Sequence, residues 1–369
     1  MMNEQILQNY QNDVLDLFKM HYRKLSVKDL NIQFKTVLMS TFEELGLRDF
    51  QEKDVFFLEE WFKLIHEQTF IKDLIPNKEM NEIIFHSNNF VQVLSSNKKE
   101  SHHIKNLSLE DYQLSFELLA LKHNASWNFS HPFVSFFSLI FDHPFRVTLI
   151  HYSTSANSKS KIFLRSLKKT SPTLDLFQEK SKTIDFLTEQ LHSKKNILIS
   201  GSTGSGKTTF LRALINEISP QEHLIVLEDT HEIVSASPQH TSLLAQNELL
   251  NKSLKDYCAY ALRMSPDRLI IGEMRSSEVV PFLLAMNTGH KGLMSTVHAN
   301  SAGDALTRIA LLFSLYAENK ELDYKLVTKL VCKNIDFVVH MEDKRIKQIA
   351  RVLGSEGETP YFELIYERE

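Results

Sequence analysis

Glycine is scarce in this chain, which has 10 glycines among its 369 residues, whereas average usage would give roughly 26. Seven of the ten lie from Gly201 to Gly303, and none lies between Gly46 and Gly201. Glycine is used where the backbone must be bare or must adopt a positive φ. The clustering therefore predicts that a ligand contacts the main chain between residues 201 and 303.

Cysteines and long apolar runs are also rare in this chain. The two cysteines, Cys258 and Cys332, each lie in an apolar, helix-like run, which excludes a disulfide framework and a CxxC zinc site and predicts buried thiols in a reducing compartment. The first residues show no basic segment followed by an apolar one, so no secretory signal is expected. The most apolar run, residues 133–141, is too short to cross a bilayer. These absences predict a cytoplasmic protein that reaches a membrane only through a partner.

The chain has no excess of positive charge. Its formal net charge is −4 and its isoelectric point is about 6.5, so the overall basic footprint of a nucleic-acid coat is missing. Apolar residues make up 43% of the chain and charged residues 24%, which excludes disorder and is enough for two ordinary hydrophobic cores.

Four segments differ in their hydrophobic pattern. Residues 1–65 carry apolar residues at helical spacing among many charges and predict a helical extension. Residues 66–169 combine short β-like runs with one amphipathic helix, 108–122, and predict a small α+β sensor-like domain. Residues 170–180 begin with Thr-Ser-Pro-Thr and predict a linker. Residues 181–369 form the remaining, larger domain.

The larger domain alternates helices with short buried strands. This order is typical of an α/β fold with a parallel sheet and helices on both faces. The last strands are most simply antiparallel strands at the sheet edge. The strand candidates are 196–200, 224–227, 268–271 and 293–297, followed by 336–340, 346–353 and 361–366.

A phosphate-binding motif follows the first of these strands. The segment Gly201-Ser-Thr-Gly-Ser-Gly-Lys-Thr208 matches G-x-x-x-x-G-K-[ST] in full and opens a helix from Lys207 to Ile218. A chance match is the alternative, and the flanking strand and helix argue against it. Lys207 is expected to reach the β and γ oxygens of a nucleotide and Thr208 to bind Mg²⁺. The expected binding residues are Gly201, Ser202, Thr203, Gly204, Ser205, Gly206, Lys207, Thr208 and Thr209.

The nucleotide is predicted to be ATP. Guanine-binding proteins carry N-K-x-D, and here Asn77-Lys-Glu-Met and Asn251-Lys-Ser-Leu both lack the aspartate. Hydrolysis also needs carboxylates near the γ-phosphate, and Glu228 and Glu273 each follow a predicted strand. Carboxyl ends of parallel strands line the crevice where such sheets bind ligands. A solvated charge is the alternative for either glutamate alone, and their joint placement favours function.

Histidine and arginine supply the remaining candidates. His298 ends another apolar strand, where its imidazole could sense the γ-phosphate, whereas His290 is better explained as a core histidine. Arginine can stabilise the charge of a hydrolytic transition state from the same or a neighbouring subunit. A surface charge is the alternative for each arginine. The stronger candidates are Arg263, Arg268 and Arg275, and the weaker ones are Arg212, Arg146 and Arg165.

Residues 196–309 resemble the ATPase core of the type II/type IV secretion traffic ATPases. The resemblance rests on the phosphate loop, on the acidic box Leu227-Glu-Asp-Thr-His-Glu-Ile233, on Leu262 to Arg275, and on the histidine box from Thr288 to Ala302. The runs Ala285-Met-Asn-Thr-Gly-His and Asp304-Ala-Leu-Thr-Arg308 are most similar to the branch that powers Tad/Flp pilus assembly, and are close to the type IV secretion branch.

This resemblance implies a RecA-like P-loop NTPase domain joined to a sensor-like N-terminal domain, in a homo-hexamer that hydrolyses ATP with Mg²⁺ and drives inner-membrane platform proteins. It implies Glu228 as the base, Glu273 as the Walker B carboxylate that holds Mg²⁺ together with Thr208, and His298 as the γ-phosphate sensor. The N-terminal segment around Arg146 departs from the family pattern, and Ser166 follows Arg165 where a lysine is expected.

Four functions remain open at this point. An ATP-driven motor of pilus assembly or secretion is favoured, most simply of the Tad/Flp type, because the tetracysteine zinc insertion of the type II secretion and type IV pilus extension branches is absent. A type IV secretion ATPase or a regulatory ATP-binding subunit with little hydrolysis is the alternative. A nucleic-acid translocase is disfavoured by the acidic isoelectric point.

Overall fold

The computed structural model describes most of the chain in two units, Met1–Lys168 and Lys169–Glu369. The described residues are 4–26, 28–46, 52–75, 80–95, 98–105, 107–167, 172–177, 181–233, 237–245, 252–319 and 321–368. Residues 170–171 and 178–180 of the predicted linker lie outside them. None of the helices that the structure describes combines the length and the apolar character needed to cross a bilayer.

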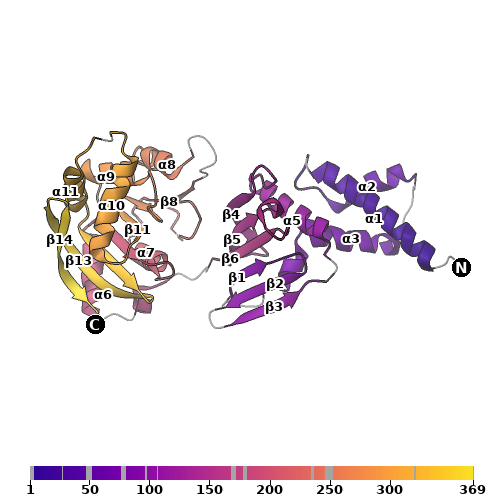
Figure 1. The fold of residues 1–369 in the computed structure, drawn as a ribbon, viewed down its shortest axis with the longest axis horizontal. Coiled ribbons are helices and arrows are strands. Elements are labelled where there is room, and N and C mark those ends of the chain that lie inside the picture. Colours follow the sequence, from indigo (N-terminus) through magenta and orange to yellow (C-terminus); the bar gives the residue numbers. More distant parts are fainter. Residues whose placement is uncertain are drawn as a thin grey trace. The chain divides into compact units, whose positions relative to one another are not determined.

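The first unit begins with helices and continues with an antiparallel sheet (Figure 1). The helices are α1 (Glu4–Ser26), α2 (Phe34–Glu44), α3 (Glu52–His66), α4 (Thr69–Lys72) and α5 (Leu109–Lys122), with a short 3-10 helix, η1 (Tyr152–Thr154). The strands are β1 (Met80–Phe85), β2 (Phe90–Ser95), β3 (Lys99–His103), β4 (Phe133–Ile140), β5 (His143–Ile150) and β6 (Lys161–Ser166). They pair in the order β3-β2-β1-β6-β5-β4.

The helical segment and the sheet of the first unit share one hydrophobic core. Phe18 of α1 and Ile65 of α3 belong to the same buried cluster as Phe85 of β1 and Phe116 of α5. The Ser115 hydroxyl of α5 also donates to the carbonyl of Ile65 at 3.0 Å. The helices α1, α2 and α3 therefore contribute side chains to the core of the first unit.

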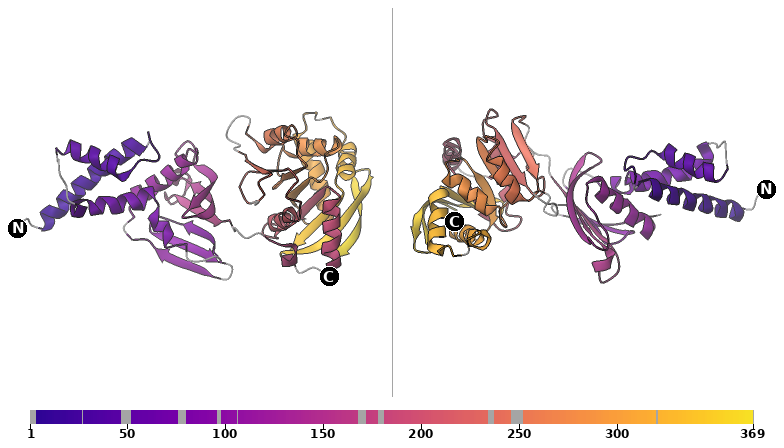
Figure 2. Two further views of the ribbon diagram at one scale, coloured as in Figure 1. Left: turned by 180° about the vertical axis from the view of Figure 1, so that it is seen from behind. Right: turned by 90° about the horizontal axis from the view of Figure 1, so that it is seen from above.

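The second unit contains an eight-stranded sheet with helices on both faces (Figure 2). Its helices are η2 (Leu174–Phe177), α6 (Ser181–His192), α7 (Lys207–Asn216), α8 (Leu254–Ala261), α9 (Val279–Asn287), α10 (Ala302–Tyr316) and α11 (Tyr324–Asn334). Its strands are β7 (Ile197–Gly201), β8 (Leu224–Glu228), β9 (His240–Leu244), β10 (Arg268–Ile271), β11 (Met294–His298), β12 (Phe337–Glu342), β13 (Arg345–Glu356) and β14 (Thr359–Glu367).

The central strands of this sheet are apolar on both sides because each side has its own core. Leu198 of β7 packs with α8 to α11, whereas its neighbours Ile197 and Ile199 pack with η2, α6 and α7. The order is β14-β13-β12-β7-β11-β10-β8-β9, and the six strands from β12 to β9 run parallel. Their carboxyl ends consequently meet at one edge of the sheet, which is where Gly201, Glu228 and His298 lie.

The sequence-based strand assignments differ from the structure at the sheet edges. Strand β12 was expected to be antiparallel, but it pairs in parallel with β7 and only its other side is antiparallel, to β13. Strands β3, β4 and β9 were not predicted. All three are edge strands, which need only one partner and carry no run buried on both faces. Cys258 and Cys332 are buried free thiols, as predicted.

Candidate active site

The phosphate loop joins β7 to α7 at the carboxyl edge of the sheet. Gly201 has φ of +152°, and a Cβ built on it would lie 2.4 Å from the carbonyl oxygen of Met341. Gly206 adopts the left-handed conformation, with φ of +95°, as the residue before the helix. Both positions therefore require glycine, one for space and the other for backbone conformation.

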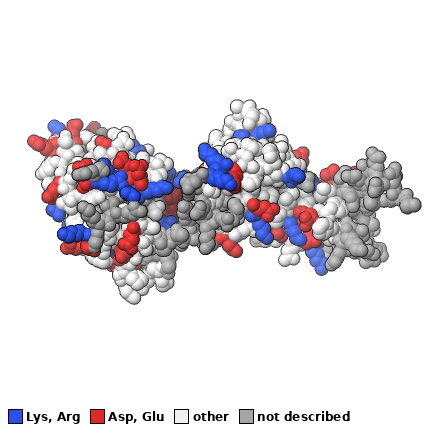
Figure 3. Space-filling view, turned by 90° about the horizontal axis from the view of Figure 1, so that it is seen from below, with Lys and Arg blue, Asp and Glu red and all other residues white. Residues whose placement is uncertain are grey.

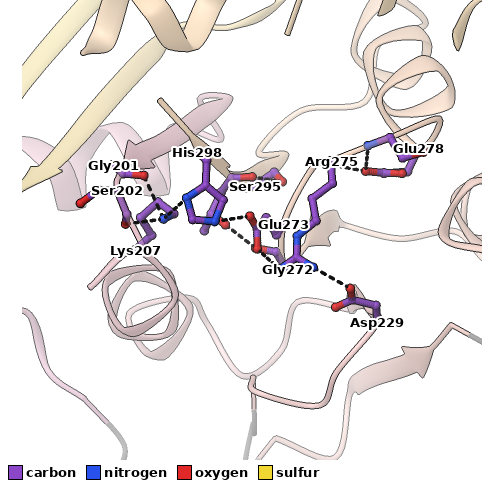
Figure 4. Close-up of polar contacts among 12 residues, drawn as sticks. Gly201, Ser202, Lys207, Asp229, Gly272, Glu273, Arg275, Glu278, Ser295 and His298 are labelled. Atoms are coloured by element: carbon purple, nitrogen blue, oxygen red, sulfur yellow. Dashed lines mark hydrogen bonds and ion pairs between the residues drawn. The ribbon is translucent and has the colours of Figure 1, made fainter. Parts of the chain in front are cut away.

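The Lys207 side chain is buried and folds back over this loop. Its Nζ donates to the carbonyl oxygens of Gly201 at 3.0 Å and Ser202 at 2.8 Å, and it lies 3.2 Å from Nδ1 of His298 (Figure 4). Burial lowers the pKa of Lys207, although the nearby Glu273 opposes that shift. The ammonium is held by neutral acceptors at the centre of the loop, in a position to exchange them for anionic oxygens.

His298 connects Lys207 to Glu273. Its Nε2 lies 2.8 Å from Oε1 of Glu273, while its Nδ1 accepts from Lys207. This geometry fits a neutral imidazole that carries its proton on Nε2. Burial lowers the pKa of His298, Glu273 opposes this shift, and the cations of Lys207 and Arg275 add to it. The structure thus brings three predicted site residues, from α7, β11 and the segment after β10, into one row of polar contacts. Oε1 of Glu273 is close to His298 but is buried without a hydrogen-bond partner among the described residues.

Arg275 extends this row of polar contacts to a second carboxylate. Its guanidinium pairs with Glu273 and, through Nη1, with Oδ2 of Asp229 at 3.2 Å. The pair with Glu273 raises the pKa of Arg275. The backbone N–H groups of Arg275 and Ser276 both donate to Oε1 of Glu278, at 2.5 and 2.7 Å. Of the three strong arginine candidates, Arg275 is the one that the structure places beside Glu273.

Glu228 lies next to this row of polar contacts but faces its own loop. Its Oε1 accepts from the backbone N–H groups of Glu232 and Ile233, both at 3.0 Å, and its Oε2 lies 3.4 Å from Nδ1 of His231. Gly272 permits this packing, because a Cβ there would lie 3.1 Å from Cγ of Glu228. The side chain is 3% exposed, and burial raises its pKa.

Arg268 and Arg263 lie at the opposite edge of the sheet, away from the phosphate loop of their own chain. Action of the exposed Arg263 on the nucleotide of a neighbouring subunit stays a prediction. Arg268 begins β10, opposite the first residue of β8, so its side chain leaves from the amino edge. It is 1% exposed and binds both carboxylate oxygens of Glu222. Arg263 is exposed after the end of α8, before β10 begins. Position along the strand decides the outcome, because only residues that follow a parallel strand reach the phosphate edge.

The weaker arginine candidates occupy other places. Arg212 lies on α7, where Glu228 and Glu232 oppose the lowering of its pKa by burial. Arg146 and Arg165 lie opposite each other on β5 and β6 of the first unit. His290 is half-buried, with Nδ1 3.3 Å from the carbonyl oxygen of Ala285, as a packed structural histidine would be.

Two residues of the site, Asp229 and Glu278, were not among the predicted site residues. Asp229 follows Glu228 directly, so the same strand end could have indicated it. Glu278 gave a weaker signal, a lone glutamate before the apolar run of α9. Its contacts are made to backbone amides three and two residues earlier, and such a local turn is not visible in hydrophobic spacing.

The loop residues fit a nucleotide and its metal ion. A Cβ built on Gly204 would meet no heavy atom within 4 Å, so the crest of the loop is open. The Ser205 hydroxyl is buried and has no hydrogen-bond partner among the residues that the structure describes. Thr208 stands one residue after Lys207 at the start of α7, and Glu273 is the nearby carboxylate. A hydroxyl and a carboxylate are oxygen donors of the kind that Mg²⁺ prefers.

Known proteins resemble this chain over the part that carries the candidate site. Residues 142–348, more than half of the chain, match the model of a family described as "Type II/IV secretion system protein". The chain is 38% identical to the type IV secretion system protein PtlH of Bordetella pertussis over 172 residues, which cover 45% of this chain and 50% of PtlH. It thus spans about half the length of the curated relatives that it matches.

Two solved structures resemble the fold over about four fifths of the chain. The ATPase DotB of Legionella pneumophila is 16% identical, with a TM-score of 0.56 over 81% of this chain and 78% of DotB. The pilus retraction motor PilT with bound ADP is 22% identical, with a TM-score of 0.56 over 81% of this chain and 82% of PilT. These likenesses confirm the predicted fold class, a RecA-like domain with a smaller α+β N-terminal domain.

Proposed function

This chain belongs to the family of type II/IV secretion system proteins, and we propose on that premise that it is an ATP-hydrolysing motor for pilus assembly or secretion in a bacterial envelope. One observation carries the proposal. Next to a complete phosphate loop, Lys207 is hydrogen-bonded to His298, and His298 in turn lies 2.8 Å from Glu273, at the carboxyl edge of the sheet. A binding protein without hydrolysis would not need the carboxylate and the histidine to meet the loop lysine.

In the proposed reaction, the nucleotide is ATP. Lys207 leaves the carbonyls of Gly201 and Ser202 and binds the β and γ oxygens, because these anionic acceptors outweigh neutral ones. That movement frees Nδ1 of His298. Once Nδ1 takes up a proton it donates to a γ-phosphate oxygen, while the carboxylate of Glu273 beside Nε2 stabilises the resulting imidazolium, and loss of the γ-phosphate removes this acceptor. Thr208 and Glu273 are the residues that would hold Mg²⁺, and the ion would neutralise charge on the phosphates when bound.

The general base is assigned to Glu228. Burial raises the pKa of its carboxyl group, which makes the carboxylate a better proton acceptor. In the present geometry its oxygens face His231 and two backbone amides. The proposal therefore requires the loop from Glu228 to Ile233 to release the carboxylate during the cycle. Arg275, beside Glu273, is the arginine proposed to stabilise the negative charge on the phosphoryl oxygens in the transition state.

The proposed assembly is a homo-hexamer at the cytoplasmic side of the inner membrane, where platform proteins receive the work. The face drawn in Figure 3 mixes Lys and Arg with Asp and Glu side chains. Together with the net charge of −4, this favours protein partners over nucleic acid. Tad/Flp pilus assembly is the finer proposal, supported by residues 285–290 and 304–308. Type IV secretion is the second candidate, favoured by the identity with PtlH. Identification of the membrane proteins that cross-link to the chain in cells separates the two.

Steady-state hydrolysis tests the motor directly. Lys207→Ala is expected to abolish nucleotide binding, because the loop loses the buried cation that its own carbonyl oxygens hold. Glu273→Gln is expected to bind ATP and to lose at least about 100-fold in kcat, as for removal of a charge-stabilising group. Binding is measured by calorimetry and hydrolysis by phosphate release.

Two outcomes oppose the proposal. The first is wild-type protein that binds ATP but releases no phosphate at any concentration at which it forms oligomers. That result would indicate a regulatory ATP-binding subunit and not a motor. Lys207→Ala protein with wild-type affinity would remove the phosphate-loop assignment. Lys333→Ala is the matched control, since that side chain is exposed just before the amino end of β12.

A further inference from the structure

The turn between β12 and β13 lies against the phosphate loop. Strand β12 runs parallel to β7 with His340 opposite Ser200 and Met341 opposite Gly201, so β12 ends where the loop begins. The Ser200 hydroxyl and Nδ1 of His340 are 2.9 Å apart and buried, which fixes the two strands at this point. Asp343 and Lys344 then adopt φ of 51° and 60°. Two successive left-handed residues make a tight hairpin turn of defined geometry.

Lys344 contacts the loop at its last glycine. A Cβ built on Gly206 would lie 3.4 Å from Cα, 3.7 Å from Cβ and 3.9 Å from Cγ of Lys344. The stem of the lysine thus lies along the residue that precedes Lys207 and α7. Lys344 is exposed, and no carboxylate among the described residues forms an ion pair with it. The neighbouring Glu342 faces Arg368, at 4.0 Å.

The order of the strands sets the direction in which a nucleotide would lie across the phosphate loop. Glu273 and His298 follow β10 and β11, which lie on one side of β7, and the turn that carries Lys344 follows β12, on the other side. A nucleotide with its γ-phosphate beside Glu273 and His298 therefore extends its α-phosphate toward Lys344. A lysine ammonium on a flexible stem suits such a phosphate as a compact, mobile charge.

We propose that Lys344 is a second phosphate-binding lysine, which binds the α-phosphate of ADP and ATP alike. This inference rests on the proposed function, because it requires that the loop binds an adenine nucleotide in the direction just described. It assigns the β12–β13 turn a role in affinity, whereas Lys207, His298 and Glu273 act at the γ end. Since both nucleotides carry the α-phosphate, Lys344 contributes equally to the binding of substrate and product.

Calorimetry of the full chain with Mg-ADP and with a non-hydrolysable ATP analogue tests the inference. Lys344→Ala is expected to raise Kd for both ligands by the same factor, about tenfold, as for loss of one charge-assisted contact. The kcat at saturating ATP is expected to stay within about twofold of wild type, and Lys344→Arg to restore affinity. Lys333→Ala is the matched control, because Lys333 is exposed just before the amino end of β12.

The possible results separate this inference from the proposed function. An unchanged Kd for Lys344→Ala, in a protein whose binding still depends on Lys207, overturns the inference alone. An increase in Kd for the ATP analogue but not for ADP also overturns it, because the contact would then lie at the γ end. Wild-type protein that binds neither ligand overturns the proposed function as well. If Lys344→Ala lowers the thermal unfolding midpoint of the nucleotide-free protein, Lys344→Gln takes the place of Lys344→Ala in the binding test, because glutamine keeps most of the aliphatic stem over Gly206.

Discussion

Arg268 is a fully buried side chain whose guanidinium is paired with a carboxylate and a backbone carbonyl. Its Nε and Nη2 bind the two carboxylate oxygens of Glu222 at 2.8 and 3.1 Å, and its Nη1 donates to the carbonyl of Leu191 at 2.9 Å. Burial alone would raise the pKa of Glu222, but Arg268 and Lys194 outweigh burial and lower it. This bidentate pair ties α6 and the segment before β8 to the start of β10, so Arg268 is a structural residue.

Replacement of Arg268 is expected to destabilise the second unit. Arg268→Ala removes the buried partner of Glu222, which keeps its 3.2 Å contact with the more exposed Lys194, and breaking a buried ion pair costs about 3–5 kcal/mol. Urea unfolding followed by circular dichroism measures this loss. Both tryptophans, Trp61 and Trp127, lie in the first unit, so the transition seen by tryptophan fluorescence is an internal control and should not shift.

Arg263→Ala is the companion variant and is expected to change stability by less than about 0.5 kcal/mol, as exposed positions do. A stable Arg268→Ala protein without ATPase activity would contradict the structural role and return Arg268 to the catalytic candidates.

At the scale of elements, the segment from Glu273 to Glu278 between β10 and α9 organises the site. Glu278 is 3% exposed and accepts the backbone N–H groups of Arg275 and Ser276. The same segment is tied to β11, because the backbone N–H of Met274 donates to the carbonyl of Thr296 at 2.9 Å. Glu278 therefore acts through Arg275 as a positioning residue, and it touches no part of the phosphate loop in the described contacts.

Substitution of Glu278 is expected to separate catalysis from binding. Glu278→Ala leaves two amides without an acceptor and lets Arg275 move, so kcat should fall at least about tenfold with Kd for ADP little changed, at a stability cost of about 1–3 kcal/mol. Glu278→Gln keeps a carbonyl acceptor and should recover most of the activity. ATPase kinetics and ADP calorimetry on both variants give the answer; equal kcat for the Ala and Gln variants would argue against positioning.

The strands show why some elements were predictable and others were not. Strands β7, β8, β10 and β11 are buried on both faces, so their apolar runs are visible in the sequence. Strand β9 is half-buried, and β3 is polar and largely exposed. Each is held by backbone pairing with one neighbour, which the side-chain pattern does not record.

At the scale of the whole molecule, each unit has its own hydrophobic core and its own titrating groups. In the first unit, His66 of α3 stacks on Phe62 with ring centroids 4.8 Å apart, and its Nδ1 lies 2.8 Å from the Tyr22 hydroxyl of α1. Burial, helped by the nearby Lys122, lowers the pKa of His66 to about 4. The folded first unit thus keeps this histidine neutral over a range in which an unfolded chain would protonate it.

Stability of the first unit is therefore expected to fall as the pH falls from about 6.5 to about 4. In that window the unfolded chain binds a proton at residue 66 that the folded chain does not bind, which favours unfolding. The slope contributed by one such group approaches about 1.4 kcal/mol per pH unit. Urea titrations followed by tryptophan fluorescence at several pH values measure it.

The variant His66→Gln should reduce the slope of unfolding free energy against pH by the contribution of up to one bound proton. The variant His131→Gln, at an exposed turn, should leave that slope unchanged. An identical slope for wild type and His66→Gln would show that other groups cause the acid sensitivity.

The sequence by itself determined the phosphate loop, the parallel α/β domain and the strand ends that carry Glu228, Glu273 and His298. These features depend on local spacing, on glycine and on burial of a strand on both faces, all of which are written along the chain. Only the tertiary structure decided that His298 lies between Glu273 and Lys207, that Arg268 is buried with Glu222, and that Lys344 lies on Gly206. Those contacts join residues far apart in the chain, and the register of neighbouring strands sets which of them meet.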